Sequence, residues 1–479
     1  MGSDWMSLVA VEARLLPLYA ASTCMISFSK FVVEQWIITT YCLELEVEDC
    51  SDNAVGVYTA HWMRWFDLAS SVTAFITMPF IGLLSDTVKA AANSADSYAR
   101  SSIVFAQACM LSLTLVACAL QAMYDLPRSL LLGGAIASSS LGGVYAFLPT
   151  IFALRADLCA SDQQPAAFLR VELSMFVGIS VGIKAAGSAI GDSFDPHRRA
   201  AREPIVLCVA AFAWMVLLVA LWLLTACSAS HGSGSGVQEG TRQGHCTSHG
   251  HASRLTLTSI GRLVCERLRS LREIEQVARA HARYLSCILV SFAVFSSSNG
   301  LNGGLLLYFN HLGMSPRLAS HFSAEVVEFG AIQLILAQVL LTKVSREVVL
   351  CVASLGGMMG YVCLASRDDT VRRLYPPLAS MIFPGFPIVR AIVASLIPPD
   401  RAQTALTALG ITEHLAASAS SFGFLTLFGA YMASSTPELP VLIAAGIYLV
   451  GTFSAAKAVL IARGANGTEG PASRPVLLM

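Results

Sequence analysis

Stretches of about 20 mostly apolar residues recur along the whole chain, separated by clusters of charged and turn-forming residues. A helix of that length crosses the hydrocarbon core of a bilayer. We therefore predict an all-α integral membrane protein with twelve membrane-spanning helices. Their approximate ranges are 15–40, 63–84, 102–123, 129–152, 166–190, 204–227, 284–308, 320–342, 347–365, 374–397, 404–430 and 438–462.

The composition agrees with this pattern. Of the 479 residues, 55% are hydrophobic and only 13% are charged. Soluble proteins carry about twice that share of charged residues, so a soluble enzyme is excluded. The sequence contains no glycine-rich nucleotide-binding loop, so ATP is not the expected energy source. We expect a lipid bilayer as the main partner, and neither a nucleic acid nor a cofactor or bound metal.

The stretch between the sixth and seventh predicted helices differs in character from the rest. It begins as a Gly/Ser/His-rich linker and continues as an arginine-rich segment. It divides the chain into an N-terminal six-helix half (1–227), a cytoplasmic central loop (228–283) and a C-terminal six-helix half with a tail (284–479). Six plus six helices around a basic central loop is the layout of a major facilitator transporter.

Lysine and arginine are more frequent in the central loop, the tails and the loops on their side of the membrane than in the opposite loops. This bias predicts that both termini are cytoplasmic. The expected location is the plasma membrane or an endolysosomal membrane, and the charge bias does not decide between them. Three arginines between residues 198 and 202 depart from the bias, because they fall in a connection assigned to the exterior.

The cysteines are scattered and form neither a disulfide framework nor a zinc pattern. Cys42 and Cys50 both fall in the first exterior loop, where oxidation is possible, and the sequence leaves open whether they are bridged. The linker also contains a histidine-rich run, which we interpret as low-complexity sequence and not as a metal site. That run comprises His245, Cys246, His249 and His251.

Arg390 lies inside the apolar sequence FPGFPIVRAIVAS, at residues 383–395. A charge at the centre of a bilayer costs about 2.5 to 3.5 kcal/mol even on lenient scales. Pro384 and Pro387 loosen the helix beside it, as in the broken helices of transporter sites. We predict a cation that faces a central cavity and binds a carboxylate of an anionic substrate. The alternative is a structural ion pair with an acid on a neighbouring helix.

Glu172 lies about a turn inside the fifth predicted helix, in FLRVELSMFVGISVGIKAAG. An acid in an apolar helix is a candidate proton carrier, because it can load and release a proton as its exposure alternates. The alternative is an ion pair with Arg170 that only anchors the helix near the surface. Gly178, Gly182 and Gly187 follow at four- and five-residue spacing, which favours close helix packing.

Other polar residues within the predicted helices are further candidates for a proton relay or a cavity lining. Glu413, next to His414 in the eleventh helix, is assigned to proton coupling, and Glu325 and Glu328 in the eighth helix are weaker candidates. Asn299 and Asn302 in FSSSNGLNGG mark a polar, glycine-broken seventh helix and are assigned to substrate binding.

The sequence GLLSDTVKAA, at residues 82–91, closes the second predicted helix. It resembles the G-x-L-S-D-x-x-G-R-R signature of the major facilitator superfamily, whose aspartate holds the cytoplasmic gate closed. Gly82, Ser85 and Asp86 match the signature, whereas Lys89 and two alanines stand in place of Gly-Arg-Arg. The resemblance implies that Gly82, Asp86 and Lys89 belong to a gate.

Several stretches in matching order resemble the family of the proton-coupled folate transporter and the thymic stromal cotransporter. They are VEARLLPLY at 11–19, VEQWI at 33–37, HWMRW at 61–65 and PIVRAIVASLI at 387–397. The resemblance implies proton-driven uptake of folates or related organic anions. It also implies that Glu172 couples protons, Arg390 binds protons and substrate, and Asp86 serves the gate. The chain departs from the family's folate carrier at SSSNG, 296–300, where that carrier has a histidine.

Two other functions remain open at this point. The chain is alternatively an exporter of amphipathic organic compounds, which would use the same fold in the outward direction. It is alternatively a transport-dead membrane sensor or scaffold, which would use the central loop to hold a partner. The sequence fixes neither the exact substrate nor the oligomeric state.

Overall fold

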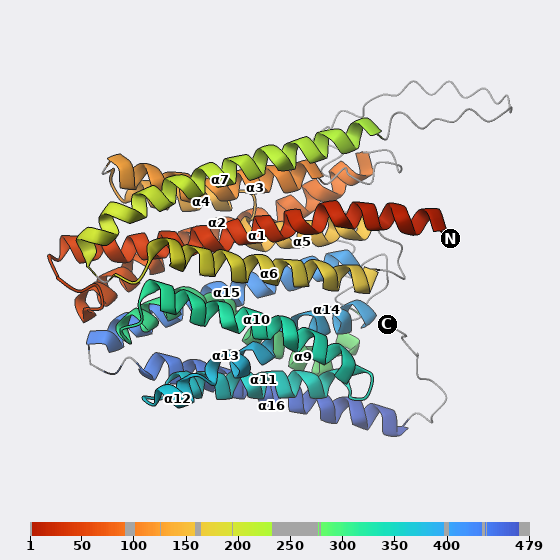
Figure 1. The fold of residues 1–479 in the computed structure, drawn as a ribbon. Coiled ribbons are helices and arrows are strands. Elements are labelled where there is room, and N and C mark those ends of the chain that lie inside the picture. Colours follow the sequence, from red (N-terminus) through yellow and green to blue (C-terminus); the bar gives the residue numbers. More distant parts are fainter. Residues whose placement is uncertain are drawn as a thin grey trace.

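The computed structural model describes residues 2–91, 101–124, 126–158, 164–193, 195–231, 276, 279–396, 402–433, 436 and 438–468. These residues form long helices that lie side by side with roughly aligned axes (Figure 1). The N-terminal half contains α1 (Gly2–Glu44), α2 (Asn53–Ala91), α3 (Ser101–Tyr124), α4 (Ser129–Ser139), α5 (Gly143–Leu158), α6 (Gln164–Ile190) and α7 (Pro196–His231). The C-terminal half contains α9 (Ala282–His311), α10 (Pro316–Leu341), α11 (Arg346–Leu364), α12 (Asp369–Arg372), α13 (Tyr375–Ala379), η1 (Ser380–Ile382), α14 (Gly385–Leu396), α15 (Ala402–Ala433) and α16 (Glu438–Thr468).

Each predicted membrane-spanning segment coincides with one of these helices or with a series of shorter ones. Nine segments in the described part of the chain are long and apolar enough to cross a membrane: α3, α6, α7, α9, α10, α11, the series Asp369–Val393, α15 and α16. The fourth predicted span is interrupted between α4 and α5, where Gly142 and Gly143 adopt positive φ angles of 84° and 59°. Glycine adopts this conformation without steric cost, so the break follows from the local sequence.

The tenth predicted span is also broken, and the break lies beside Arg390. The helix stops at η1 and restarts as α14 at Gly385, on either side of Pro384. Proline supplies no backbone N–H group and clashes with the preceding turn. The sequence prediction of a discontinuous helix at this position is confirmed.

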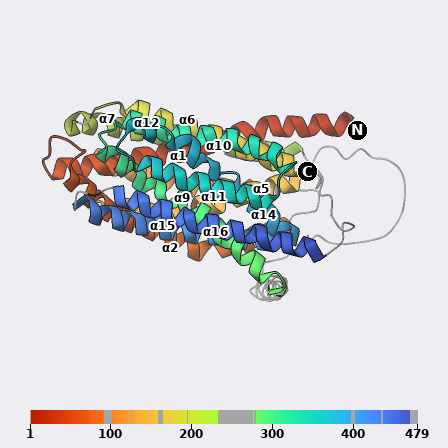
Figure 2. The same cartoon turned by 90° about the horizontal axis from the view of Figure 1, so that it is seen from below.

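Glycines on α6 let α1 and α10 approach this helix closely. A Cβ atom on Gly178 or Gly182 would collide with the α1 backbone carbonyl of Ala20 or Cys24, and one on Gly187 would collide with Ser320 of α10. The spacing seen in the sequence therefore serves two interfaces, one within the N-terminal half and one between the halves. In Figure 2, α15 lies beside α2, which is a second contact between the halves.

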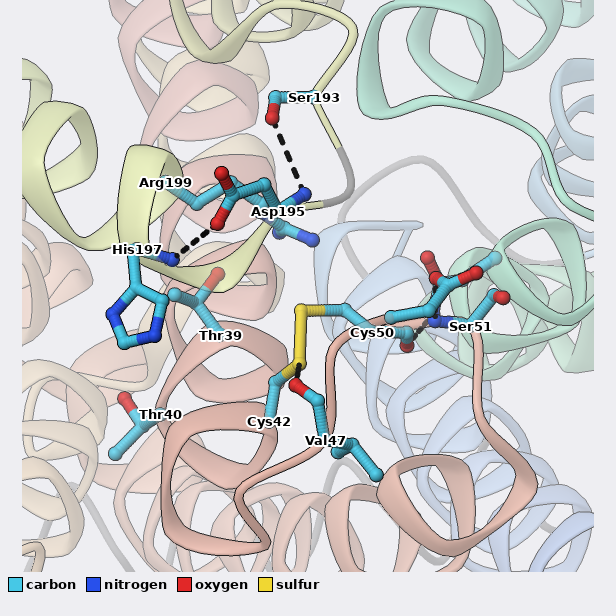
Figure 3. Close-up of a disulfide and its surroundings, with 12 residues drawn as sticks. Thr39, Thr40, Cys42, Val47, Cys50, Ser51, Ser193, Asp195, His197 and Arg199 are labelled. Atoms are coloured by element: carbon cyan, nitrogen blue, oxygen red, sulfur yellow. Dashed lines mark hydrogen bonds between the residues drawn. A yellow bond between two sulfur atoms is a disulfide. The ribbon is translucent and has the colours of Figure 1, made fainter.

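Cys42 and Cys50 are joined by a disulfide in the turn between α1 and α2 (Figure 3). We call this end of the bundle the disulfide end; the turns that follow α6 and α9 lie there too, and the turn between α10 and α11 lies at the opposite end. The bridge answers the question that the sequence left open. An oxidised pair suits an exterior loop.

Arg199 departs from its predicted place in an exterior connection. It belongs to α7 and is fully buried, with its Nε donating to Glu203 Oε1 at 2.9 Å. Its charge is therefore paired inside the bundle, and it does not count against the predicted charge bias of the loops.

The boundaries of the predicted central loop remain a prediction. Helix α7 continues to His231 and α9 begins at Ala282, and most of the intervening stretch lies outside the described residues. The histidine-rich run and the end of the C-terminal tail also lie outside them.

Candidate functional site

Arg390 lies in the second turn of α14, directly after the break in the helix. Its Nη2 donates to Glu413 Oε2 at 2.9 Å, and its Nη1 donates to Glu172 Oε1 at 3.4 Å. The arginine side chain is 33% exposed, whereas the two carboxylate side chains are 15% and 14% exposed. The guanidinium is therefore held by both acids and still presents part of its surface to a ligand.

The three charged residues come from three separate elements. Glu172 is on α6 in the N-terminal half, while Arg390 on α14 and Glu413 on α15 belong to the C-terminal half. The ion pair between Arg390 and Glu172 thus joins the two halves at their interface. The alternative to a substrate-binding role for Arg390 was an ion pair with an acid on a neighbouring helix, and the arginine does have such partners. They are Glu172 and Glu413, the two acids assigned to proton coupling.

Polar groups on neighbouring helices complete the surroundings of Glu413. Asn299 on α9 donates through Nδ2 to Glu413 Oε1 at 3.5 Å. His414 is buried, and its Nε2 donates a hydrogen bond of 2.9 Å to the Ser71 carbonyl oxygen on α2. Asn302 is in α9, one turn from Asn299, but its side chain lies outside the described part. Its role in substrate binding stays a prediction.

The charge of this cluster sets its chemistry. When both carboxylates are ionised, they and the guanidinium carry a net charge of minus one in a site that is mostly shielded from water. Protonation of one carboxylate neutralises the cluster and releases guanidinium donors, because a protonated acid is a much weaker acceptor. The arrangement therefore links the protonation of an acid to the availability of a cation.

A second set of charged residues, which the sequence analysis did not connect, lies between α1, α2 and α15. Asp67 Oδ2 on α2 accepts a hydrogen bond of 2.5 Å from Ser421 Oγ on α15. Glu34 on α1 is buried and pairs with Lys30 at 3.8 Å. Asp67 is an acid inside a predicted span, and a scan of such positions would have found it. Among the described residues, no three His, Cys, Asp or Glu side chains are close enough to hold a metal ion.

Contacts along α6 close the interface between the halves on the disulfide side of Arg390. One turn beyond Glu172, the ring of Phe176 packs edge-on against Phe383 at 5.0 Å. Farther along, Lys184 pairs with Glu328 at 2.5 Å, and Ser180 donates to the same carboxylate oxygen at 2.6 Å.

The closure continues to the end of the bundle. Asp192, just after α6, accepts from Ser315 Oγ at 2.7 Å and pairs with Arg317 at 3.6 Å. Asn310 on α9 donates to the Cys50 carbonyl oxygen at 2.6 Å. Glu328, a weaker candidate for the proton relay, is therefore placed among the contacts that close this end, while its neighbour Glu325 is exposed.

The residues assigned to the gate lie near the C-terminal end of α2, away from the disulfide end. Gly82, Asp86 and Lys89 all belong to this helix, which continues to Ala91. The side chains of Asp86 and Lys89 lie outside the described part, so their role in gating remains a prediction.

Comparison with solved structures identifies transporters of the same fold. The chain is similar to the D-xylose-proton symporter, with a TM-score of 0.61, 13% identity, and 93% of this chain and 96% of that chain covered. It is similar to the E. coli fucose:proton symporter, with a TM-score of 0.52, 14% identity, and coverage of 92% and 98%.

The nucleoside transporter NupG gives a TM-score of 0.55 at 12% identity, with 92% of this chain and 99% of that chain covered. At such low identities these likenesses establish the fold alone. A comparison with curated protein sequences finds no match. The family model described as Major Facilitator Superfamily matches residues 21–421. Since this match spans most of both halves, the chain belongs to the Major Facilitator Superfamily of membrane transporters.

Proposed function

We propose that the protein takes up small organic anions together with protons, and that Arg390 exchanges a glutamate partner for a carboxylate of the substrate. The observation that carries this proposal is the contact of one arginine with Glu172 and Glu413 across the interface between the halves. Secondary transporters bind substrate and coupling ion at such an interface, often beside a broken helix.

The exchange begins with a proton. When both acids are ionised, they occupy the donors of Arg390 and make the site negative, which disfavours an incoming anion. A proton on Glu413 removes the acceptor that lies 2.9 Å from Nη2. The released donors then bind the substrate carboxylate, for which the planar guanidinium is well suited.

The exchange also keeps the charge of the site constant. Before it, the site holds one arginine and two carboxylates; afterwards it holds one arginine, one protein carboxylate and one substrate carboxylate. One proton enters for each negative charge that is bound. A monoanion therefore crosses with one proton without net charge movement, and the cost of moving a charge through the membrane potential is avoided.

Release of the contact between the halves links this exchange to movement. Arg390 and Glu172 belong to opposite halves, so a second proton, on Glu172, weakens an interaction that holds the halves together. A dicarboxylate substrate supplies the second negative charge that balances this proton. In the present arrangement the interface is closed on the disulfide side, along α6. We assign the disulfide end to the exterior and the termini to the cytoplasm, in the plasma membrane or an endolysosomal membrane. Asp86, Gly82 and Lys89 are proposed to close the opposite end.

Folates and related carboxylates are the proposed substrates. The released arginine would donate hydrogen bonds to a carboxylate of the substrate. Asn299 beside Glu413 offers a further donor. The D-xylose and fucose transporters of similar fold are proton symporters, which agrees with a proton as the driving ion.

The proposal is tested by uptake of labelled folate into cells with confirmed surface expression, at mildly acidic and at neutral external pH. Wild type and the control Arg283→Ala, an exposed arginine at the start of α9, should show uptake stimulated by acid. Arg390→Ala should show none. Equal uptake by Arg390→Ala would overturn the assignment of the arginine. Efflux from loaded vesicles against an opposed proton gradient would instead indicate an exporter. No flux of any anion in either direction, with a partner bound through residues 228–283, would indicate a scaffold.

A further inference from the structure

A cavity opens on the surface between the turn that joins α10 to α11 and the last turns of α16. It has a volume of about 410 Å³ and is lined by Lys343 and Arg463 together with Val344, Val348 and Val459. These elements lie at the end of the bundle opposite the disulfide, where α1 begins (Figure 1). The cavity is therefore separate from the Arg390 site and from the contacts that close the disulfide end.

The two cationic side chains that line the cavity are available to a ligand. Lys343 and Arg463 are exposed, and neither forms an ion pair with another described residue. Glu347 is the acid in the lining, and its Oε1 accepts a hydrogen bond of 2.6 Å from Tyr284 Oη. The cavity thus has an excess of positive charge, contributed by Lys343 in the turn after α10 and by Arg463 on α16.

An apolar path leads from the cavity into the membrane. Val348 in the lining begins a series at helical spacing on α11, and these residues share one face of the helix. The series continues with Val352, Leu355 and Met359, which are 46%, 45% and 42% exposed. Helix α11 is one of the segments long and apolar enough to span a bilayer, so this face meets lipid tails.

We propose that this cavity binds the headgroup of an anionic phospholipid, with the acyl chains along the exposed face of α11. Lys343 and Arg463 would contact the phosphate and the additional negative charge of the headgroup, which are strong acceptors for both side chains. The positive charge at the rim and the apolar face below it match the two parts of one lipid molecule. Anionic lipids are concentrated in the cytoplasmic leaflet, which is the side assigned to this end of the bundle.

The proposal is tested with the purified full-length protein, delipidated in detergent and then incubated with an equimolar mixture of phosphatidylserine and phosphatidylcholine. Mass spectrometry of the repurified protein measures how much of each lipid is retained. Wild type should retain phosphatidylserine in preference to phosphatidylcholine. The double variant Lys343→Gln with Arg463→Gln should lose this preference, because neutral amides bind phosphate far more weakly.

Matched variants separate a built site from general surface charge. Arg283→Gln with Lys457→Gln removes the same charge from α9 and α16 outside the cavity lining, and should retain phosphatidylserine as wild type does. Lys343→Arg with Arg463→Lys keeps both charges and should also retain it. If the double glutamine variant does not fold, each single glutamine variant should show a partial loss.

Three results would overturn the proposal. The first is wild-type preference for phosphatidylserine in the double glutamine variant. The second is an equal loss in the control with Arg283 and Lys457 replaced, which would indicate diffuse attraction. The third is displacement of phosphatidylserine by an equimolar amount of inorganic phosphate, which would indicate a site for a soluble anion. None of these readouts depends on transport.

Discussion

Arg199 and Arg390 both lie in helices and pair with glutamates, and their surroundings differ in a way that separates structure from function. Arg199 on α7 is completely buried; its Nε donates to Glu203 and its Nη2 donates to Gln35 Oε1 at 2.5 Å. Thr39 donates to the same glutamate at 3.0 Å. Figure 3 places Arg199 and Thr39 close to the disulfide. All of these residues belong to the N-terminal half, so none of these contacts crosses the interface between the halves.

Arg390 differs from Arg199 in exposure and in the origin of its partners. Its side chain is 33% exposed, and one of its two acids, Glu172, comes from the opposite half. A buried pair inside one half cannot change partners during transport, whereas a partly exposed pair between halves can. The comparison teaches that an arginine in a membrane helix is a substrate-site candidate when it is partly exposed and one of its partners belongs to the other half.

The largest effect is expected from Arg199→Met, which would leave Glu203 buried without its cation. Breaking a buried pair from one side destabilises a protein by about 3 to 5 kcal/mol. The yield of monodisperse protein in detergent and its melting temperature should fall sharply. The double variant Arg199→Met with Glu203→Met should recover much of the loss. Wild-type melting of Arg199→Met would remove the distinction between the two arginines.

Arg390→Gln should abolish most transport and destabilise the protein less than Arg199→Met does, because the Arg390 site is partly open to water and the Arg199 site is not. A hydrogen bond between charged groups contributes about 1.5 to 3 kcal/mol, which corresponds to roughly a tenfold to hundredfold loss of substrate affinity. Labelled folate uptake, normalised to surface expression, measures the first effect, and the melting temperature measures the second. Arg390→Lys should retain part of the activity, because it keeps the charge and loses the planar donors.

Gly187→Ala should have a smaller effect, on the closure of the disulfide end. The added methyl group would collide with Ser320 of α10, and overpacking at such an interface costs about 1 to 3 kcal/mol. Turnover should fall severalfold at saturating substrate, while the melting temperature changes little. The control is Gly446→Ala on α16, where a Cβ atom would meet nothing within 4 Å. Equal turnover in both variants would mean that this closure is not required.

The smallest effect is expected from Asp67→Asn at the second charged cluster. The amide keeps an acceptor for the Ser421 hydroxyl, so the loss should be about 0.5 kcal/mol, or roughly a factor of two in uptake. Uptake should keep its stimulation by acid. A complete loss of that stimulation would show that protons enter through Asp67 and not only through the acids beside Arg390.

The helices and the break beside Arg390 were predictable because their causes are local. An apolar run of sufficient length and a proline inside it act on neighbouring residues. The interruption of the fourth predicted span was missed, although Gly142 and Gly143 stand at that position. The length of the apolar run predicts one continuous helix over residues 129–152, and the two adjacent glycines are not by themselves a sufficient signal for a break.

The partners of the charged residues were not predictable, because they depend on contacts between distant segments. Glu172 and Arg390 are 218 positions apart, and Asp67 and Ser421 are 354 positions apart. Periodicity and hydropathy carry no information about such pairs. For the same reason Arg199 was assigned to an exterior connection, although its partners Gln35 and Glu203 hold it inside the bundle.

The most direct test of the exchange at Arg390 is the ratio of labelled folate uptake at mildly acidic and neutral external pH for Glu413→Gln in proteoliposomes. Glutamine resembles the protonated acid and does not titrate. In this variant the arginine is therefore released from position 413 at both pH values, and lowering the pH should have little further effect. The account predicts that the acid stimulation of wild type is strongly reduced in Glu413→Gln and unchanged in the control Glu48→Gln, an exposed acid between α1 and α2. Acid stimulation equal to wild type in Glu413→Gln would contradict the account.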